Sequence, residues 1–212
     1  MLNKAQVDYS LVLVTDSSGK ELDTFCTAVE QAISGGVTLV QLREKTATSR
    51  EFYELALRIK KITDRYNVPL IINDRLDIAL AVDASGLHVG QEDLPAAVAR
   101  QLLGPNKILG ATAATVEDAL AAEAAGADYL GSGAMYPTVT KPGKPVLPME
   151  QLARIKQAVR IPVVAIGGIT ADNIDPVLRT GVDGVAVVTA IMSSADPAAA
   201  TRKLKLVLLS GG

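Results

Sequence analysis

The chain alternates from end to end between short apolar runs and longer segments with helical spacing. Runs such as Leu70–Asn73 and Val163–Ile166 follow a proline directly and are almost wholly apolar, which predicts strands buried on both faces. The segments between the runs carry apolar residues at every third or fourth position, which predicts amphipathic helices. Strands that are buried on both faces are typical of a parallel sheet whose two faces are covered, usually by helices.

Strands are predicted at Ser10–Thr15, Thr38–Leu42, Leu70–Asn73, Gly86–Val89, Lys107–Ala111, Tyr129–Gly131, Val163–Ile166 and Gly184–Val188. The clearer helices are predicted at Leu22–Ser34, Ser49–Tyr66, Val116–Ala125, Met149–Val159, Ala171–Arg179 and Pro197–Leu209, with shorter ones after Asp74 and Asp93. The spacings Thr48–Glu51 and Thr115–Asp118 match capping boxes, which supports the starts of two of these helices.

This succession predicts the fold class. About eight strand–helix units in 212 residues, with no change of composition along the way, predict an α/β fold, a TIM (β/α)8 barrel, as a single compact domain over residues 1–212. A doubly wound open sheet is the main alternative, and it would usually show a Gly-rich loop after its first strand. The first strand here runs into Val14-Thr-Asp-Ser-Ser-Gly19, which lacks that fingerprint, so the barrel is favoured.

The charge of the chain argues against nucleic acid or an anionic membrane as a partner. The formal net charge is −2 and charges of both signs are interspersed, whereas such partners select basic surfaces. Aromatic residues are 3% of the chain, so stacking platforms for single strands are missing. No apolar stretch approaches the ~20 residues that cross a bilayer, and no signal-peptide core is present. We therefore expect a cytoplasmic protein.

The segment from Gly131 to Pro148 interrupts the alternation, because it has neither helical nor strand periodicity. A stretch of this length without structure inside a compact domain is usually functional. Thr138, Thr140 and Lys141 give it groups that bind anions, so we predict an active-site lid at residues 133–148. The alternative is a surface excursion without a role.

Basic and polar residues lie on the second strand. Strand side chains alternate, so Gln41, Arg43 and Lys45 share one side of the run. Near the mouth of a barrel, Arg43 and Lys45 could face a multiply charged phosphate, the first as a fork and the second as a point charge. A structural salt bridge of Arg43 with a neighbouring aspartate is the alternative.

Two aspartates follow the next two strands. Asp74 comes after Asn73 at the end of the third strand, and Asp93 follows the fourth. Mg2+ favours one or two protein carboxylates with water and phosphate oxygens in its remaining positions, so the pair predicts a magnesium site. The alternative for both is a helix N-cap. His88, the only histidine, lies mid-strand and is expected to be structural rather than a general base.

Glycines follow the seventh strand and Thr189 follows the eighth. In these barrels the loops after strands seven and eight form the usual phosphate site, and Gly167 and Gly168 would allow a close backbone approach. A tight turn that needs glycine only for its conformation is the alternative. Phosphate sites on opposite sides of one mouth indicate two phosphorylated substrates that are joined.

Taken together, these residues resemble the thiamine phosphate synthase family, also called thiamine-phosphate pyrophosphorylase, over nearly the whole chain. The matching motifs are Gln41-Leu-Arg-Glu-Lys45, Asn73-Asp74, Gly90-Gln-Glu-Asp93, Pro137-Thr-Val-Thr-Lys141, Gly167-Gly-Ile169 and Val188-Thr-Ala-Ile191. The resemblance implies a transferase that couples hydroxymethylpyrimidine pyrophosphate to hydroxyethylthiazole phosphate, giving thiamine phosphate and pyrophosphate. It also implies a dissociative substitution assisted by Mg2+, in which pyrophosphate leaves before the thiazole nitrogen attacks.

The resemblance further implies a role for each matching position. The pyrimidine pyrophosphate would be bound by Gln41, Leu42, Arg43, Glu44, Lys45, Asn73, Thr112 and Lys141. The thiazole phosphate would be bound by Thr138, Val139, Thr140, Gly168, Val188 and Thr189, and Mg2+ by Asp74 and Asp93. Arg43, Lys45 and Lys141 would be the catalytic residues.

The chain departs from the family pattern at a few positions. Thr112 and Thr189 stand where the family usually has serine, and Ala113-Ala114 where it often has a larger residue. Each threonine keeps the hydroxyl, so these departures bear on the level of activity rather than on the reaction.

Other functions compete with this interpretation. A thiazole tautomerase-like relative would keep the barrel without the metal pair, a binding protein would release no pyrophosphate, and a sugar-phosphate isomerase would need a base at a strand tip. The sequence leaves the oligomeric state open, a homo-oligomer included.

Overall fold

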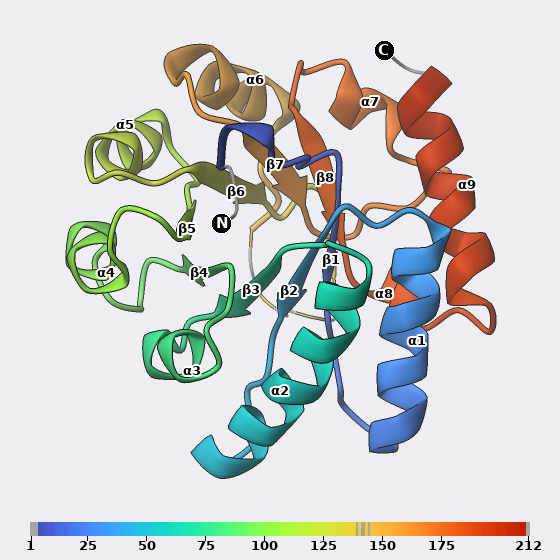
Figure 1. Ribbon diagram of the computed structural model, residues 1–212. Helices are drawn as coiled ribbons and strands as arrows, with labels where there is room; N and C mark the ends of the chain where they lie inside the picture. The colour runs from blue at the N-terminus through green and yellow to red at the C-terminus, as the bar shows by residue number, and fades with distance from the viewer. Residues whose placement is uncertain (1–3, 139, 141–142, 144, 211–212) are drawn as a thin grey trace.

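The computed structural model describes residues 4–138, 140, 143 and 145–210, and its strands form a closed parallel barrel in the order β1 to β8 (Figure 1). The strands are β1 (Leu11–Val14), β2 (Leu39–Leu42), β3 (Leu70–Asn73), β4 (Gly86–Val89), β5 (Ile108–Thr112), β6 (Tyr129–Gly133), β7 (Val163–Ile166) and β8 (Gly184–Val187). The last strand closes the ring by pairing with the first, in the register Leu11 to Val185. The predicted TIM barrel is confirmed.

Helices surround the barrel, as Figure 1 shows. They are η1 (Lys4–Gln6), α1 (Leu22–Gly35), α2 (Ser49–Arg65), α3 (Leu76–Ala81), α4 (Ala96–Leu103), α5 (Val116–Ala124), α6 (Met149–Ala158), α7 (Asp175–Leu178), α8 (Thr189–Met192) and α9 (Pro197–Ser210). Both predicted capping boxes are present, at the starts of α2 and α5. In the part of the chain that the model describes, no helix is long and apolar enough to cross a membrane.

One helix is much shorter than predicted. The expected helix Ala171–Arg179 is reduced to α7, Asp175–Leu178. Pro176 can stand only in the first turn of a helix, because it has no N–H to donate and its ring blocks the preceding turn. Before it, the Asn173 side chain accepts from the Thr170 N–H at 2.8 Å and holds the chain in a turn instead.

Side chains alternate along every strand between the helix layer and the barrel interior. Outward residues such as Leu13 and Ile72 join one large core with the helices. Inward residues such as Val12, Leu39 and Ile71 form a smaller apolar cluster inside the barrel. Several residues of this cluster, Val14 and Tyr129 among them, also line the space that opens at the carboxyl ends of the strands.

A glycine makes room for large polar side chains inside the barrel. A Cβ at Gly110 would lie 2.3 Å from Tyr129 Cζ and 2.4 Å from His88 Nδ1. Only a residue without a side chain fits there. The glycine in β5 therefore permits the contact between its two neighbouring strands.

The first and last long helices pack against each other, which Figure 1 shows as the blue α1 beside the red α9. Gly35 lies at this contact: a Cβ there would be 2.6 Å from the Ala198 carbonyl oxygen and 2.7 Å from Thr201 Cβ. The absence of a side chain at Gly35 lets the two helices approach closely and completes the helix layer.

Candidate active site

A cavity of about 690 Å³ opens at the carboxyl ends of the strands. That size suits small-molecule ligands. It brings together most of the residues that the sequence predicted for the site: Gln41, Arg43, Lys45, Asn73, Asp74, Asp93, Thr112, Thr138, Thr140, Gly168, Val188 and Thr189. They come from loops far apart in the sequence, because parallel strands deliver all their carboxyl ends to one face of the barrel.

Two of the predicted residues do not line the cavity. Leu42 is fully buried in the core under the helices. Glu44 turns aside: it accepts hydrogen bonds from the Ser17 hydroxyl and from the backbone N–H groups of Lys45 and Thr46. Burial alone would raise the pKa of Glu44, but these hydrogen bonds outweigh it and lower that pKa. Val139 and Lys141 lie outside the described residues.

On the β2–β3 side, two buried donors have no acceptor among the described residues. These are Arg43 Nε and Asn73 Nδ2. The other end of the Arg43 guanidinium donates to the Thr140 carbonyl oxygen at 3.4 Å, so this arginine links the barrel to the predicted lid. Buried donors without partners usually mark the place of a ligand or ordered water. The salt bridges between described residues do not include Arg43, so they give no support to the structural alternative for it.

Asp74 and Asp93 lie next to each other, and Lys45 forms an ion pair with Asp74. Neither aspartate is a helix N-cap, because those positions belong to Arg75 and Pro95. Asp74 instead has a left-handed backbone with φ +65°, which non-glycine residues adopt mainly at sites that constrain them.

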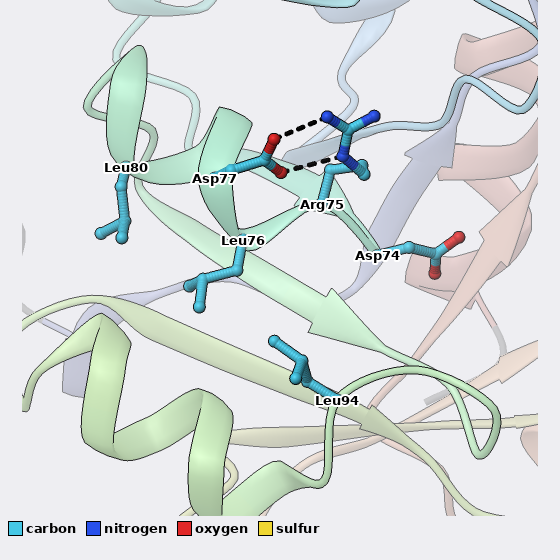
Figure 2. Close-up of a pocket in the computed structure, with 6 residues that line it drawn as sticks. All are labelled: Asp74, Arg75, Leu76, Asp77, Leu80 and Leu94. Atoms are coloured by element: carbon cyan, nitrogen blue, oxygen red, sulfur yellow. Dashed lines mark hydrogen bonds and ion pairs between the residues drawn. The ribbon is translucent and has the colours of Figure 1, made fainter. Parts of the chain in front are cut away.

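The conformation of Asp74 separates it from the residue that follows. An outer groove of about 470 Å³ begins at Asp74, whose carboxylate points away from the leucines of the groove in Figure 2, while Arg75 turns back along the outer face and pairs with Asp77. Leu76, Leu80 and Leu94 line this groove (Figure 2). The left-handed backbone at Asp74 therefore goes with a carboxylate that lies in the barrel mouth, whereas the side chain of Arg75 lies outside it.

The carboxylate pair has the chemistry of a magnesium site. Burial, and then the hydrogen bond and charge of Asp74, raise the pKa of Asp93, as expected for two acids that share a small space. Over the described residues, no group of three or more His, Cys, Asp or Glu could hold a metal ion. A cation here would need water and substrate oxygens to complete its shell, which is the usual arrangement for Mg2+.

The floor of the cavity is a chain of hydrogen bonds. Gln41 Nε2 donates to the Tyr129 hydroxyl at 3.3 Å, and that hydroxyl lies 2.9 Å from His88 Nδ1. His88 Nε2 lies 3.0 Å from the Thr112 hydroxyl. Burial raises the pKa of Tyr129, so the phenol stays protonated. His88 lies mid-strand as predicted and lines the cavity, so its expected structural role stays a prediction.

On the opposite side, Gly167 and Gly168 form a turn in the left-handed region, with φ +104° and +65°. A Cβ at Gly167 would be 2.6 Å from Ala134 Cβ, and one at Gly168 would be 2.8 Å from the Pro137 carbonyl oxygen. The glycines are thus needed both for backbone conformation and for close packing against the start of the 133–148 segment. Thr189 follows β8 nearby and begins α8.

The sequence did not point to four residues that shape this site. Tyr129 and His88 form its floor, and Tyr136 and Asn173 hold the turn after β7. Strand alternation could have placed Tyr129 and His88 inside the barrel, whereas nothing in the sequence indicates the contact between Tyr136 and Asn173.

Residues 11–191 match the sequence model of a known family, described as thiamine monophosphate synthase. The chain belongs to the thiamine monophosphate synthase family. Its members include a thiamine-phosphate synthase of Ruminiclostridium cellulolyticum, which is 55% identical over 201 residues, 95% of this chain and 96% of the relative. Thiamine-phosphate synthase 2 of Streptococcus pneumoniae is 54% identical over 192 residues, 91% of each chain. The predicted membership and the predicted transferase class are confirmed.

Solved structures agree with the family assignment. Thiamine phosphate pyrophosphorylase from Pyrococcus furiosus superimposes with a TM-score of 0.87 at 41% identity, over 98% of both chains. A geranylgeranylglyceryl phosphate synthase from Thermoplasma acidophilum, 17% identical with a TM-score of 0.70, shares the fold alone.

Proposed function

We propose that the chain is a thiamine-phosphate synthase that joins hydroxymethylpyrimidine pyrophosphate to hydroxyethylthiazole phosphate. The family supports the overall activity, and the cavity supports the division into two substrate sides. A reaction between two phosphorylated small molecules also suits the cytoplasmic location expected from the sequence.

One observation carries the proposal for the pyrophosphate side. Arg43 Nε and Asn73 Nδ2 are buried donors without acceptors among the described residues, on adjacent strands and beside the Asp74–Asp93 pair. Phosphate oxygens are the acceptors that would satisfy both, and Lys45 adds a third cationic donor. The floor formed by Gln41, Tyr129 and His88 then offers hydrogen-bonding groups to the polar edge of the pyrimidine ring.

Asp74 and Asp93 are the residues that would hold Mg2+, and the ion would supply charge stabilisation for the departing pyrophosphate. Arg43 and Lys45 supply fixed positive charge at the same place. Lys45 pairs with Asp74 in the structure, and its ammonium group has further N–H donors that could contact the pyrophosphate. Such a dissociative substitution needs neither an activated nucleophile nor a general base, because the departing pyrophosphate leaves before the thiazole nitrogen attacks.

The turn Gly167–Ile169, together with Val188 and Thr189, would take the phosphate of the thiazole substrate. All five residues line the cavity wall opposite Asp74 and Lys45. This arrangement would hold the thiazole nitrogen over the pyrimidine carbon, and positioning of that kind lowers the barrier by removing orientational freedom beforehand. Residues 133–148 would close over both substrates as a lid.

A tautomerase-like activity is the main competitor. It would require neither the carboxylate pair nor the unpaired donors on the β2–β3 side, and the cavity holds both. We therefore favour the coupling reaction.

The deciding measurement is pyrophosphate release with each substrate alone and with both, in the presence and absence of Mg2+. Release should require both substrates and the ion. If hydroxyethylthiazole phosphate binds but no pyrophosphate appears, the coupling proposal fails in favour of a tautomerase or a binding protein.

Replacement of Arg43 sharpens the same test. Arg43→Ala should lower turnover by about 10²–10³-fold, the usual cost of removing a fixed charge at the reacting centre. Arg75→Ala is the matched control, because Arg75 lies outside the cavity against Asp77. Equal rates in the two variants would count against a catalytic role for Arg43.

A further inference from the structure

Asn173 stands just behind the glycine turn that follows β7, and both ends of its carboxamide are engaged. Its Oδ1 accepts from the Thr170 N–H at 2.8 Å, and its Nδ2 donates to the Gly168 carbonyl oxygen at 2.9 Å. The side chain thus spans the turn from one end to the other. Asn173 does not itself line the cavity, whereas Gly167, Gly168 and Ile169 do.

Tyr136 holds the same turn from the other side. Its backbone N–H donates to the Gly167 carbonyl oxygen at 3.0 Å, and its hydroxyl donates to the Asn173 carbonyl oxygen at 2.6 Å. The preceding residue, Met135, donates its N–H to the Ile166 carbonyl oxygen at 3.0 Å. The first residues of the lid segment and the turn after β7 are therefore one hydrogen-bonded unit.

Gly167 and Gly168 cannot impose this shape themselves. Glycine populates both signs of φ with little preference and loses more conformational freedom on ordering than any other residue. A turn made of two such residues keeps its shape only if its surroundings hold it. Asn173 and Tyr136 supply hydrogen bonds on its two sides.

We propose that Asn173 and Tyr136 are positioning residues, which hold the Gly167–Ile169 turn in the shape that receives the phosphate of the second substrate. Asn173 sets the direction of the peptide groups between Gly168 and Thr170, and Tyr136 holds the Gly167 carbonyl group and the Asn173 backbone. The inference rests on the proposed function, since it takes this turn as the thiazole phosphate site. Neither residue needs to touch the substrate.

The test compares three variants by calorimetric binding of each substrate and by steady-state kinetics. Asn173→Ala removes both side-chain contacts, and it should weaken hydroxyethylthiazole phosphate binding about tenfold or more, since small displacements of positioning groups have effects of that size. The KM for the pyrimidine pyrophosphate should stay near its wild-type value. Asn173→Asp can still accept from Thr170 but cannot donate to Gly168, so an intermediate loss is expected. Tyr136→Phe removes one contact and should cause a smaller loss.

Matched controls separate positioning from general destabilisation. Asn106→Ala changes an exposed asparagine in the loop before β5, and Tyr66→Phe removes a hydroxyl that bonds Glu30 on the helix surface. Both should bind both substrates as the wild type does. Thermal unfolding of every variant shows whether a loss of affinity merely follows a loss of folded protein.

A titration with inorganic phosphate distinguishes failure of this inference from failure of the proposed function. Mg2+ and pyrophosphate are added first, so that they fill the Arg43 side of the cavity and the added phosphate reports on the other side. Suppose that the wild type fails to bind hydroxyethylthiazole phosphate and yet binds inorganic phosphate. If Asn173→Ala then weakens phosphate binding, the proposed coupling reaction is wrong and the positioning role of Asn173 stands. Wild-type affinity in Asn173→Ala, an equal loss for both substrates, or no phosphate binding in the wild type would each overturn the role.

Discussion

Two buried hydroxyl groups in this barrel differ in whether they form a hydrogen bond. Thr201 is fully buried, and its hydroxyl donates to the Pro197 carbonyl oxygen at 2.8 Å. Ser132 is equally buried, but its hydroxyl has no partner among the described residues. An unpaired buried polar group costs stability, whereas a paired one is close to neutral or favourable.

Ser132→Ala should therefore stabilise the protein, by about 1 kcal/mol, because it removes a desolvated hydroxyl that makes no hydrogen bond. Urea unfolding measures the change. Thr201→Val is the matched control: it removes a hydroxyl that is paired, and it should shift the midpoint in the opposite direction. A loss of stability in Ser132→Ala would show that the hydroxyl has a partner after all.

Asp93→Asn tests the carboxylate pair through the pH dependence of stability. Because burial and Asp74 raise the pKa of Asp93 in the folded protein, the folded state holds that proton more tightly than the unfolded state does. The stability so contributed is present below the ordinary Asp pKa, about 3.9, and is lost as pH rises through the folded pKa. Asp93→Asn should thus raise the melting temperature of the metal-free protein slightly at neutral pH, with the gain vanishing in acid.

The same variant should lose any stabilisation by Mg2+. Asp77→Asn is the control, since the Arg75 hydrogen bond lowers the pKa of Asp77, and removing that carboxylate should lower the melting temperature at neutral pH. If Asp93→Asn behaves like Asp77→Asn, the two aspartates of the site do not repel each other.

At the scale of strands and helices, the sequence predicted most of the architecture. Leu70–Asn73, Gly86–Val89 and Val163–Ile166 are strands with the predicted bounds, because buried strands are apolar throughout and end abruptly at glycine, proline or polar residues. It was also predictable that Gln41, Arg43 and Lys45 lie on the same side of their strand, since side chains alternate along a strand.

The structure differs from the prediction where individual side-chain hydrogen bonds or very short elements decide the local structure. The helix Ala171–Arg179 is mostly turn, because the Asn173 side chain bonds Thr170 and Gly168. The four-residue helix α8 was not predicted, since such a length carries no periodicity. Glu44 turned away from the cavity toward Ser17, a residue of another loop, and no local pattern reports such a partner.

A prediction at this scale concerns β5 and its neighbours. Gly110→Ala places a methyl group between Tyr129 and His88 and should destabilise the protein by about 1–3 kcal/mol, the usual cost of overpacking. It should also break the hydrogen bond between those side chains and weaken ligand binding at the floor of the cavity. Chemical denaturation with substrate titration measures both effects. Wild-type values for both would mean that the floor can rearrange freely.

For the whole molecule, the contact between α1 and α9 completes the helix layer. Gly35→Ala would set a methyl group against the Ala198 carbonyl oxygen and should destabilise the fold by about 1–2 kcal/mol, despite the higher helix propensity of alanine. Ser34→Ala is an adjacent control on the exposed side of α1. If both variants unfold at the wild-type denaturant midpoint, the closeness of the two helices contributes little.

The closed barrel also affects synthesis of the protein on the ribosome. β1 pairs with both β2 and β8, so β1 lacks one of its two neighbours until residues 184–187 have been synthesised. Until then β1 presents an open edge, the kind of surface that pairs with other chains. The ring therefore closes late in synthesis, and protection of the nascent chain matters most before β8 has formed.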